Sequence, residues 1–103
     1  MSAPLPLAPF KSVRCAGRAP GPRLIVLGAV HGNEICGTRA IERVLAELES
    51  GALALAAGSV TFVPVTNALA YAHGRRAGDR NLNRALQPTD APREFEDHVA
   101  NWL

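Results

Sequence analysis

The segment Gly-Ala-Val-His-Gly-Asn-Glu, residues 28–34, combines side chains that can bind a metal ion. His31 and Glu34 are three residues apart, so both project to one side if the backbone there winds toward a helix. Catalytic zinc sites use an imidazole and a carboxylate placed in this way. Zinc in hydrolases takes three protein ligands and keeps one position for water, so this interpretation requires a third ligand from elsewhere.

Two other interpretations of the segment stay open. His31 can be a polar residue that finishes a strand, with Glu34 favoured by the dipole of the following helix. The glycines can also cradle an anion at a helix N-terminus, although the segment matches neither GxGxxG nor GxxxxGK[ST]. His73 and His98 are the other two histidines, and no pattern marks either as the missing ligand.

Residues 75–84 form a second group, in which four arginines and two asparagines surround an aspartate and a leucine. Guanidinium groups present paired donors in a fixed fork, and Asn adds a further donor, so the group suits recognition of a carboxylate. By composition alone, a solvated basic loop is the alternative.

The elements that position these groups are predicted from apolar patterns. Residues 24–27 are continuously apolar, which predicts a strand buried on both faces of a sheet. Asn33 is a good N-cap for a helix that packs one apolar face on the sheet and ends at Gly51. A second strand is expected over Val60–Val65, and strand, helix and strand together predict a parallel βαβ unit whose carboxyl ends share one edge, where open α/β folds bind ligands.

The remainder is expected to be a long loop over residues 67–92 with at most short helical turns, followed by a helix from Arg93. Glu94, Glu96 and Asp97 suit the first turns of that helix because of its dipole. The helix shows no stop signal before Leu103, so we expect the natural chain to continue.

Composition narrows the class of protein. The chain has 103 residues, 48% hydrophobic and 19% charged, which is typical of one folded domain or a piece of one. A net charge of +2 gives no support for a nucleic-acid partner. No apolar run is long enough to span a membrane. The two cysteines favour reduced thiols in the cytoplasm. Cys36 is expected to be a small buried side chain that fills space in the core.

The order and spacing of the two groups resemble the succinylglutamate desuccinylase and aspartoacylase family, which is related to the zinc carboxypeptidases. The resemblance rests on the HGNE segment at 31–34 and on Asn81-Leu82-Asn83-Arg84, with Arg76 between them. It covers roughly residues 24–103.

The resemblance implies roles for five residues. His31 and Glu34 would bind Zn2+, Asn83 and Arg84 would hold a substrate carboxylate, and Arg76 would polarise the scissile carbonyl and stabilise the oxyanion. An arginine aimed at developing negative charge and a metal acting as Lewis acid both lower the barrier to hydrolysis of an amide.

The sequence departs from the family pattern in three ways. Ala68 replaces a proline after Asn67, and Asn81 stands where many relatives carry Asp. The family's third zinc ligand and its general-base glutamate belong to later segments, so the third protein ligand is absent from this chain.

These features predict an α/β fold with a mostly parallel or mixed sheet and flanking helices, as in the N-terminal part of a zinc carboxypeptidase-like domain. Residues 1–22 are expected to form an irregular lead-in with a possible edge strand, and residues 23–103 the first part of a catalytic domain. The predicted function is zinc-dependent hydrolysis of an N-acyl amide in a small carboxylate substrate, with the chain inactive alone. The alternatives are a carboxypeptidase-type metallopeptidase and a non-catalytic α/β module that binds a carboxylate or a partner; the oligomeric state is left open.

Overall fold

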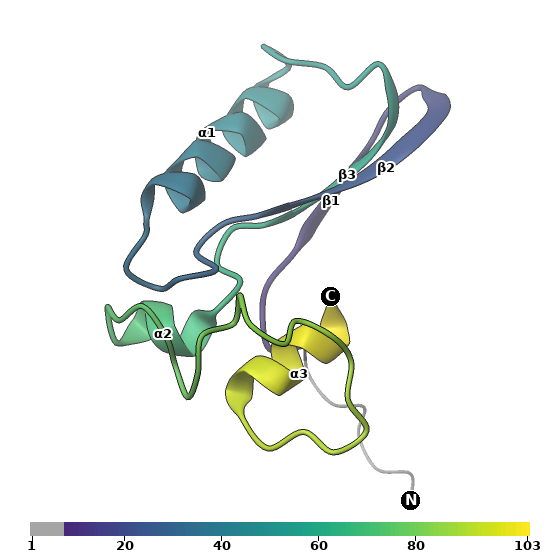
Figure 1. Ribbon diagram of the computed structural model, residues 1–103. Helices are drawn as coiled ribbons and strands as arrows, with labels where there is room; N and C mark the ends of the chain where they lie inside the picture. Colours follow the sequence, from purple (N-terminus) through teal and green to yellow (C-terminus); the bar gives the residue numbers. More distant parts are fainter. Residues whose placement is uncertain (1–7) are drawn as a thin grey trace, which may run out of the picture.

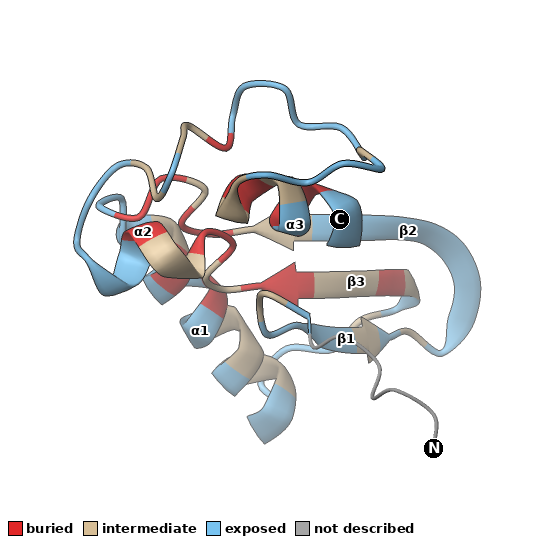
Figure 2. Ribbon diagram, turned by 90° about the horizontal axis from the view of Figure 1, so that it is seen from below, coloured by how far each residue is buried: buried red, intermediate tan, exposed pale blue. Residues whose placement is uncertain are grey.

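The computed structural model of the protein describes residues 8–103, and within them the chain forms a three-stranded sheet and three helices. The elements are, in chain order, β1 (Val13–Ala16), β2 (Ala19–Leu27), α1 (Cys36–Ser50), β3 (Ala57–Val63), α2 (Ala68–Ala72) and α3 (Phe95–Trp102). Helix α1 lies on one side of the sheet and α3 on the other, while α2 lies beyond the tips of β2 and β3 (Figures 1 and 2). The predicted α/β fold with a mixed sheet is confirmed. Part of the expected lead-in, residues 1–7, lies outside the described residues.

The sheet has the order β1-β3-β2, with β3 in the centre. Strand β1 pairs antiparallel with β3, and β2 pairs parallel with β3 in a register that sets Leu27 opposite Val63. The predicted βαβ unit is therefore present, and the carboxyl ends of β2 and β3 meet at one edge. Strand β2 already begins at Ala19, within the stretch expected to be a lead-in.

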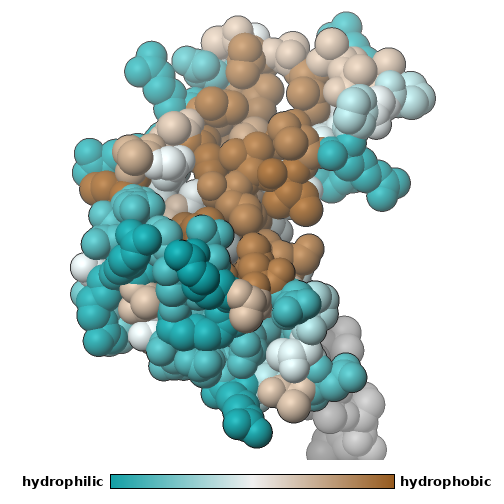
Figure 3. Space-filling view, viewed as in Figure 1, coloured by the Kyte–Doolittle hydropathy of each residue, from teal (hydrophilic) through white to brown (hydrophobic). Residues whose placement is uncertain are grey.

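The prediction that residues 24–27 are buried on both faces is wrong for this chain. Leu24 and Ile25 are 56% and 54% exposed. Strand β2 is an edge strand of the sheet, and the helices shield only its carboxyl end, as its mostly pale blue colour in Figure 2 shows. Apolar side chains also gather on the surface beside α1, in the middle of the molecule in Figure 3.

Helix α1 begins later than expected, at Cys36, and the residue before it supplies no side-chain cap. Asn33 is therefore not the N-cap; it lies in a turn in which the Glu34 N–H donates to the His31 carbonyl at 3.1 Å. Because Cys36 opens the helix on its outer side, it is exposed and is not the buried filler that was expected. The helix ends as predicted at Gly51, whose φ of +82° is a left-handed conformation that glycine adopts without strain.

The buried core lies toward the carboxyl ends of the strands. Its apolar members are Ala29, Ile41, Phe62, Val63, Ala70, Leu82, Val99 and Ala100. The long segment 67–92 contributes two of them and, apart from the five-residue helix α2, contains turns, bends and irregular backbone, as predicted. Within residues 8–103, no helix is long and apolar enough to cross a bilayer.

Candidate functional site

The loop that follows β2 is fixed by backbone hydrogen bonds to the segment that follows β3. The Gly28 N–H donates to the Val63 carbonyl at 2.8 Å, and the Gly28 carbonyl accepts from the Thr66 N–H at 2.8 Å. The Ala29 carbonyl accepts from the Asn67 N–H at 3.0 Å. These bonds hold the start of the 28–34 loop at the edge of the sheet, where the parallel topology brings both strand ends together.

His31 and Glu34 face each other at this edge. The His31 Nδ1 atom lies 3.2 Å from Glu34 Oε2. The imidazole is buried, with 9% of the residue exposed, whereas the Glu34 side chain is 58% exposed. The turn after β2 therefore brings the two candidate ligands together, as their spacing predicted.

The other nitrogen of the imidazole is held by Asn81, which lies fifty residues further along the chain. His31 Nε2 is 2.9 Å from Asn81 Oδ1, and the same oxygen accepts the backbone N–H of Asn83 at 3.0 Å. Because a backbone N–H can only donate, the atom at this position is the amide oxygen, which can only accept. The proton of a neutral His31 is consequently on Nε2, and its lone pair is on Nδ1.

This arrangement leaves two electron-rich atoms opposed. The Nδ1 lone pair of a neutral His31 faces a carboxylate oxygen of Glu34, and neither atom carries a proton for the other to accept. A cation bound between the two atoms resolves the repulsion. A hydrogen bond from the far ring nitrogen to a protein oxygen is the usual support of a metal-binding histidine.

Arg76 lies at the exposed side of the pair. Its NH1 atom is 3.4 Å from Glu34 Oε1, and its side chain is 58% exposed. The Arg76 carbonyl accepts from the Gly32 N–H at 3.3 Å, which ties the 28–34 loop to the segment after α2. The structure thus places the predicted carbonyl-polarising arginine beside the two candidate ligands.

Asn83 and Arg84 lie in the same loop cluster, with their side chains exposed. The Arg84 N–H donates to the Asn81 carbonyl at 3.1 Å, and its guanidinium donates to the Asn83 carbonyl at 2.9 Å. Within the part of the chain that the structure describes, neither side chain hydrogen-bonds His31 or Glu34. The structure brings them to the rim of the site and not into contact with the pair.

Arg80 was predicted only as a member of the arginine-rich group that suits a carboxylate, yet it joins this loop to α3. Its NH2 atom donates to Asp97 Oδ1 at 2.8 Å, and its NH1 atom donates to the Asn81 carbonyl at 3.1 Å. The Arg80 guanidinium, together with the N–H groups of Arg93 and Glu94, lowers the pKa of Asp97 to about 2, because these donors favour the ionised carboxylate.

Glu96 was predicted to be a helix-dipole acid but is completely buried. Its carboxylate binds the loop that carries Asn81. Apolar periodicity does not reveal this role, since the partners are backbone N–H groups in a loop that precedes it by sixteen and seventeen residues.

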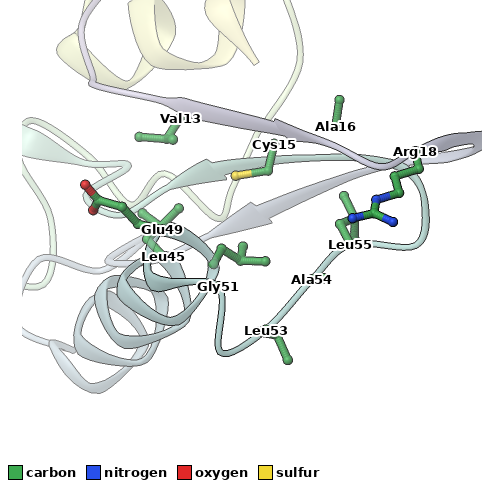
Figure 4. Close-up of a pocket in the computed structure, with 11 residues that line it drawn as sticks. Val13, Cys15, Ala16, Arg18, Leu45, Glu49, Gly51, Leu53, Ala54 and Leu55 are labelled. Carbon is green, nitrogen blue, oxygen red and sulfur yellow. The ribbon is translucent and has the colours of Figure 1, made fainter.

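The donor set among residues 8–103 is incomplete for a hydrolytic zinc, because no group of three or more His, Cys, Asp or Glu side chains converges there. A groove of about 670 Å³ lies elsewhere, between β1, the carboxyl end of α1 and the segment 51–55 (Figure 4). Its walls are mainly apolar, with Arg18 and Glu49 at the margins, so it does not bring together groups suited to hydrolysis.

Comparison with known proteins places these features in context. Residues 20–100 match the family model described as the succinylglutamate desuccinylase/aspartoacylase catalytic domain. No curated protein matches the chain.

Two solved structures resemble it. An aspartoacylase family protein from Mesorhizobium loti has 27% sequence identity and a TM-score of 0.75, over 91% of this chain and 30% of that one. The product-bound ectoine utilization protein EutE (DoeB) from Ruegeria pomeroyi has 26% identity and a TM-score of 0.68, over 84% of this chain and 26% of that one. The chain therefore spans less than a third of the length of either protein.

Proposed function

The chain belongs to the succinylglutamate desuccinylase/aspartoacylase catalytic domain family. From that premise we propose that it carries two zinc ligands, His31 and Glu34, and the substrate-binding arginines Arg76 and Arg84 of an N-acyl amide hydrolase. The observation that carries the proposal is the pair itself. His31 Nδ1 faces a Glu34 oxygen at 3.2 Å while Asn81 holds the opposite ring nitrogen. The substrate class is a small molecule that bears a carboxylate beside the amide.

The residues present fit a divalent metal ion. A neutral imidazole nitrogen and a carboxylate oxygen are zinc ligands, and their opposed lone pairs are neutralised by a cation between them. His31 and Glu34 would hold Zn2+, and the complete set needs a further ligand from another segment. When bound, zinc polarises a carbonyl and makes a bound water acidic.

The arginines and Asn83 fit the handling of an anionic substrate. Arg76 is exposed beside Glu34, so its guanidinium can approach a carbonyl oxygen that reaches the metal and stabilise negative charge developing there. Arg84 presents a fork of donors at the rim, which suits a carboxylate, and the Asn83 side chain adds a further donor. Asn81 keeps the proton of His31 on Nε2, away from the substrate.

Zinc binding by the chain tests the metal part of the proposal. We expect the chain to bind Zn2+ weakly and both His31→Ala and Glu34→Ala to reduce that binding at least tenfold, because each removes one of two ligands. Titration calorimetry with zinc chloride measures the effect. His73→Ala is the matched control, since His73 is exposed at the end of α2. Zinc affinity that survives both ligand substitutions contradicts the proposal.

Hydrolysis tests the substrate part, in a protein that carries this segment within a complete catalytic domain. We expect cleavage of N-acyl amino acids, a fall in kcat on Arg76→Ala and a rise in KM on Arg84→Ala. Preferential cleavage of peptide C-termini would instead support a carboxypeptidase-type enzyme. Carboxylate binding without any hydrolysis would support a non-catalytic module.

A further inference from the structure

Glu96 is a buried carboxylate that the proposed chemistry does not use. It is the second residue of α3 and is 0% exposed, next to the buried Val99 and Ala100 on the same helix. Burial of a charged carboxylate is costly unless hydrogen bonds replace the lost water. Its partners therefore show what this carboxylate does in the fold.

One oxygen of Glu96 holds the loop that carries Asn81. Glu96 Oε1 accepts the backbone N–H groups of Asp79 and Arg80, both at 2.8 Å. Two consecutive N–H groups on one oxygen fix the backbone direction at the point where the chain enters Asn81. Asn81 then reaches His31 Nε2 at 2.9 Å.

The other oxygen of Glu96 holds the segment to which the backbone before His31 is hydrogen-bonded. Glu96 Oε2 accepts from Asn67 Nδ2 at 3.4 Å. The Asn67 backbone N–H donates to the Ala29 carbonyl, two residues before His31, and its side-chain oxygen accepts the Ala70 N–H at the start of α2. A single carboxylate thus connects the loop that bonds the imidazole with the segment that anchors the backbone before His31.

We propose that Glu96 is a positioning residue for His31, which sets the orientation and tautomer of the imidazole from α3 without touching it. The proposal rests on the proposed function only for its consequence on metal affinity. Its primary consequence concerns the metal-free protein, in which Glu96 keeps Asn81 in place and Asn81 keeps the imidazole proton on Nε2.

The test uses Glu96→Gln, which keeps the size of the side chain and its Oε1 acceptor but turns Oε2 into a donor that opposes Asn67 Nδ2. We expect two-bond ¹H–¹⁵N spectra of the metal-free variant to show a mixture of His31 tautomers where the unsubstituted chain shows one. Zinc affinity should fall roughly tenfold, as for loss of a partner that orients a ligand. Glu42→Gln, on the exposed side of α1, is the matched control.

The double variant Asn67→Asp with Glu96→Gln restores the bond with its polarity reversed, and it also keeps the acceptor for the Ala70 N–H. We expect it to recover a single tautomer and most of the zinc affinity, which a role in general stability does not explain. Unchanged His31 spectra in Glu96→Gln, or no recovery in the double variant, would overturn the proposal. A single Nε2–H tautomer that depends on Glu96, in a chain that binds no zinc, would instead reject the metal site and leave the positioning role standing.

Discussion

Asn81 provides a neutral oxygen at a position where a carboxylate is the stronger partner for a metal-binding histidine. Its Oδ1 atom lies 2.9 Å from His31 Nε2. A carboxylate there makes the imidazole a more basic ligand, whereas an amide orients it without adding charge. In the proposed metal site, the residue at 81 would therefore set how firmly His31 holds a cation.

Substitution of Asn81 tests this directly. We expect Asn81→Asp to raise zinc affinity by about tenfold and Asn81→Leu to lower it by a similar factor, because one strengthens and the other removes the acceptor for the Nε2 proton. Competition with a chromophoric chelator measures both. Asn101→Asp adds the same charge at the far end of α3 and should change little; an Asn81→Asp variant that binds zinc more weakly contradicts the argument.

The sequence predicted part of the site. The three-residue spacing of His31 and Glu34 indicated that they meet, and the structure brings them to 3.2 Å. Asn81 was predicted as a member of the carboxylate-binding group and as a departure from the family pattern, and Glu96 was assigned to the helix dipole. Both act through contacts with residues far along the chain, and such contacts depend on the tertiary fold rather than on local spacing.

Helix α3 is attached to the loop that carries Arg80 and Asn81 through charged side chains and backbone N–H groups. Asp97 accepts from the Arg80 guanidinium at 2.8 Å and also accepts the N–H groups of Arg93 and Glu94, which caps its own helix. These donors lower the pKa of Asp97 from 3.8 to about 2. The folded state therefore binds this proton less readily than the unfolded state does.

Acid should weaken this attachment in a defined range. The stabilisation by ionised Asp97 is complete above pH 4 and is lost as the pH falls from about 4 to about 2, since the unfolded carboxylate is protonated first. We expect Asp97→Asn to lower the free energy of unfolding at pH 5 and to make little difference near pH 2. Urea unfolding followed by the fluorescence of Trp102, the single tryptophan, measures this. An equal difference at both pH values would show that the carboxylate charge does not matter.

The elements themselves were largely predictable, and their boundaries were less so. Apolar patterns indicated β2, β3 and α1, and Gly51 marked the end of the helix, whereas β1 was expected only as a possible edge strand. The start of α1 was predicted too early, because Asn33 was taken as its N-cap. Asn33 instead lies in a turn closed by a backbone hydrogen bond from Glu34 to His31, and the helix begins at Cys36 without a side-chain cap. The beginning of β2 at Ala19 was missed because Pro20, Gly21 and Pro22 are uncommon within strands.

The whole molecule has an uneven distribution of apolar surface. Leu24 and Ile25 of the edge strand β2 are more than half exposed, and apolar side chains gather beside α1 in Figure 3. The prediction of a buried strand failed for this reason. A continuous apolar run indicates that a strand favours burial, but it does not identify the element that covers the strand. Exposed apolar surface of this kind binds hydrophobic dyes and promotes association.

Polar substitutions on this strand test the point. We expect the double variant Leu24→Thr with Ile25→Thr to bind severalfold less anilinonaphthalene sulfonate and to self-associate less, while threonine keeps the strand propensity. Dye fluorescence and sedimentation velocity measure the two effects. Leu86→Thr, in the exposed loop before α3, is the control. Dye binding that does not respond to the double variant would place the apolar surface elsewhere.

Gly32 determines the direction from which a ligand can reach the buried imidazole. A Cβ atom at this position would lie 2.1 Å from the Ala70 carbonyl carbon, so the 28–34 loop and α2 touch backbone to backbone. The hydrogen bond from the Gly32 N–H to the Arg76 carbonyl also holds this loop against the segment that follows α2. The backbone of α2 therefore covers the loop on this side, and a ligand would approach from the solvent-exposed side, where the Glu34 and Arg76 side chains lie.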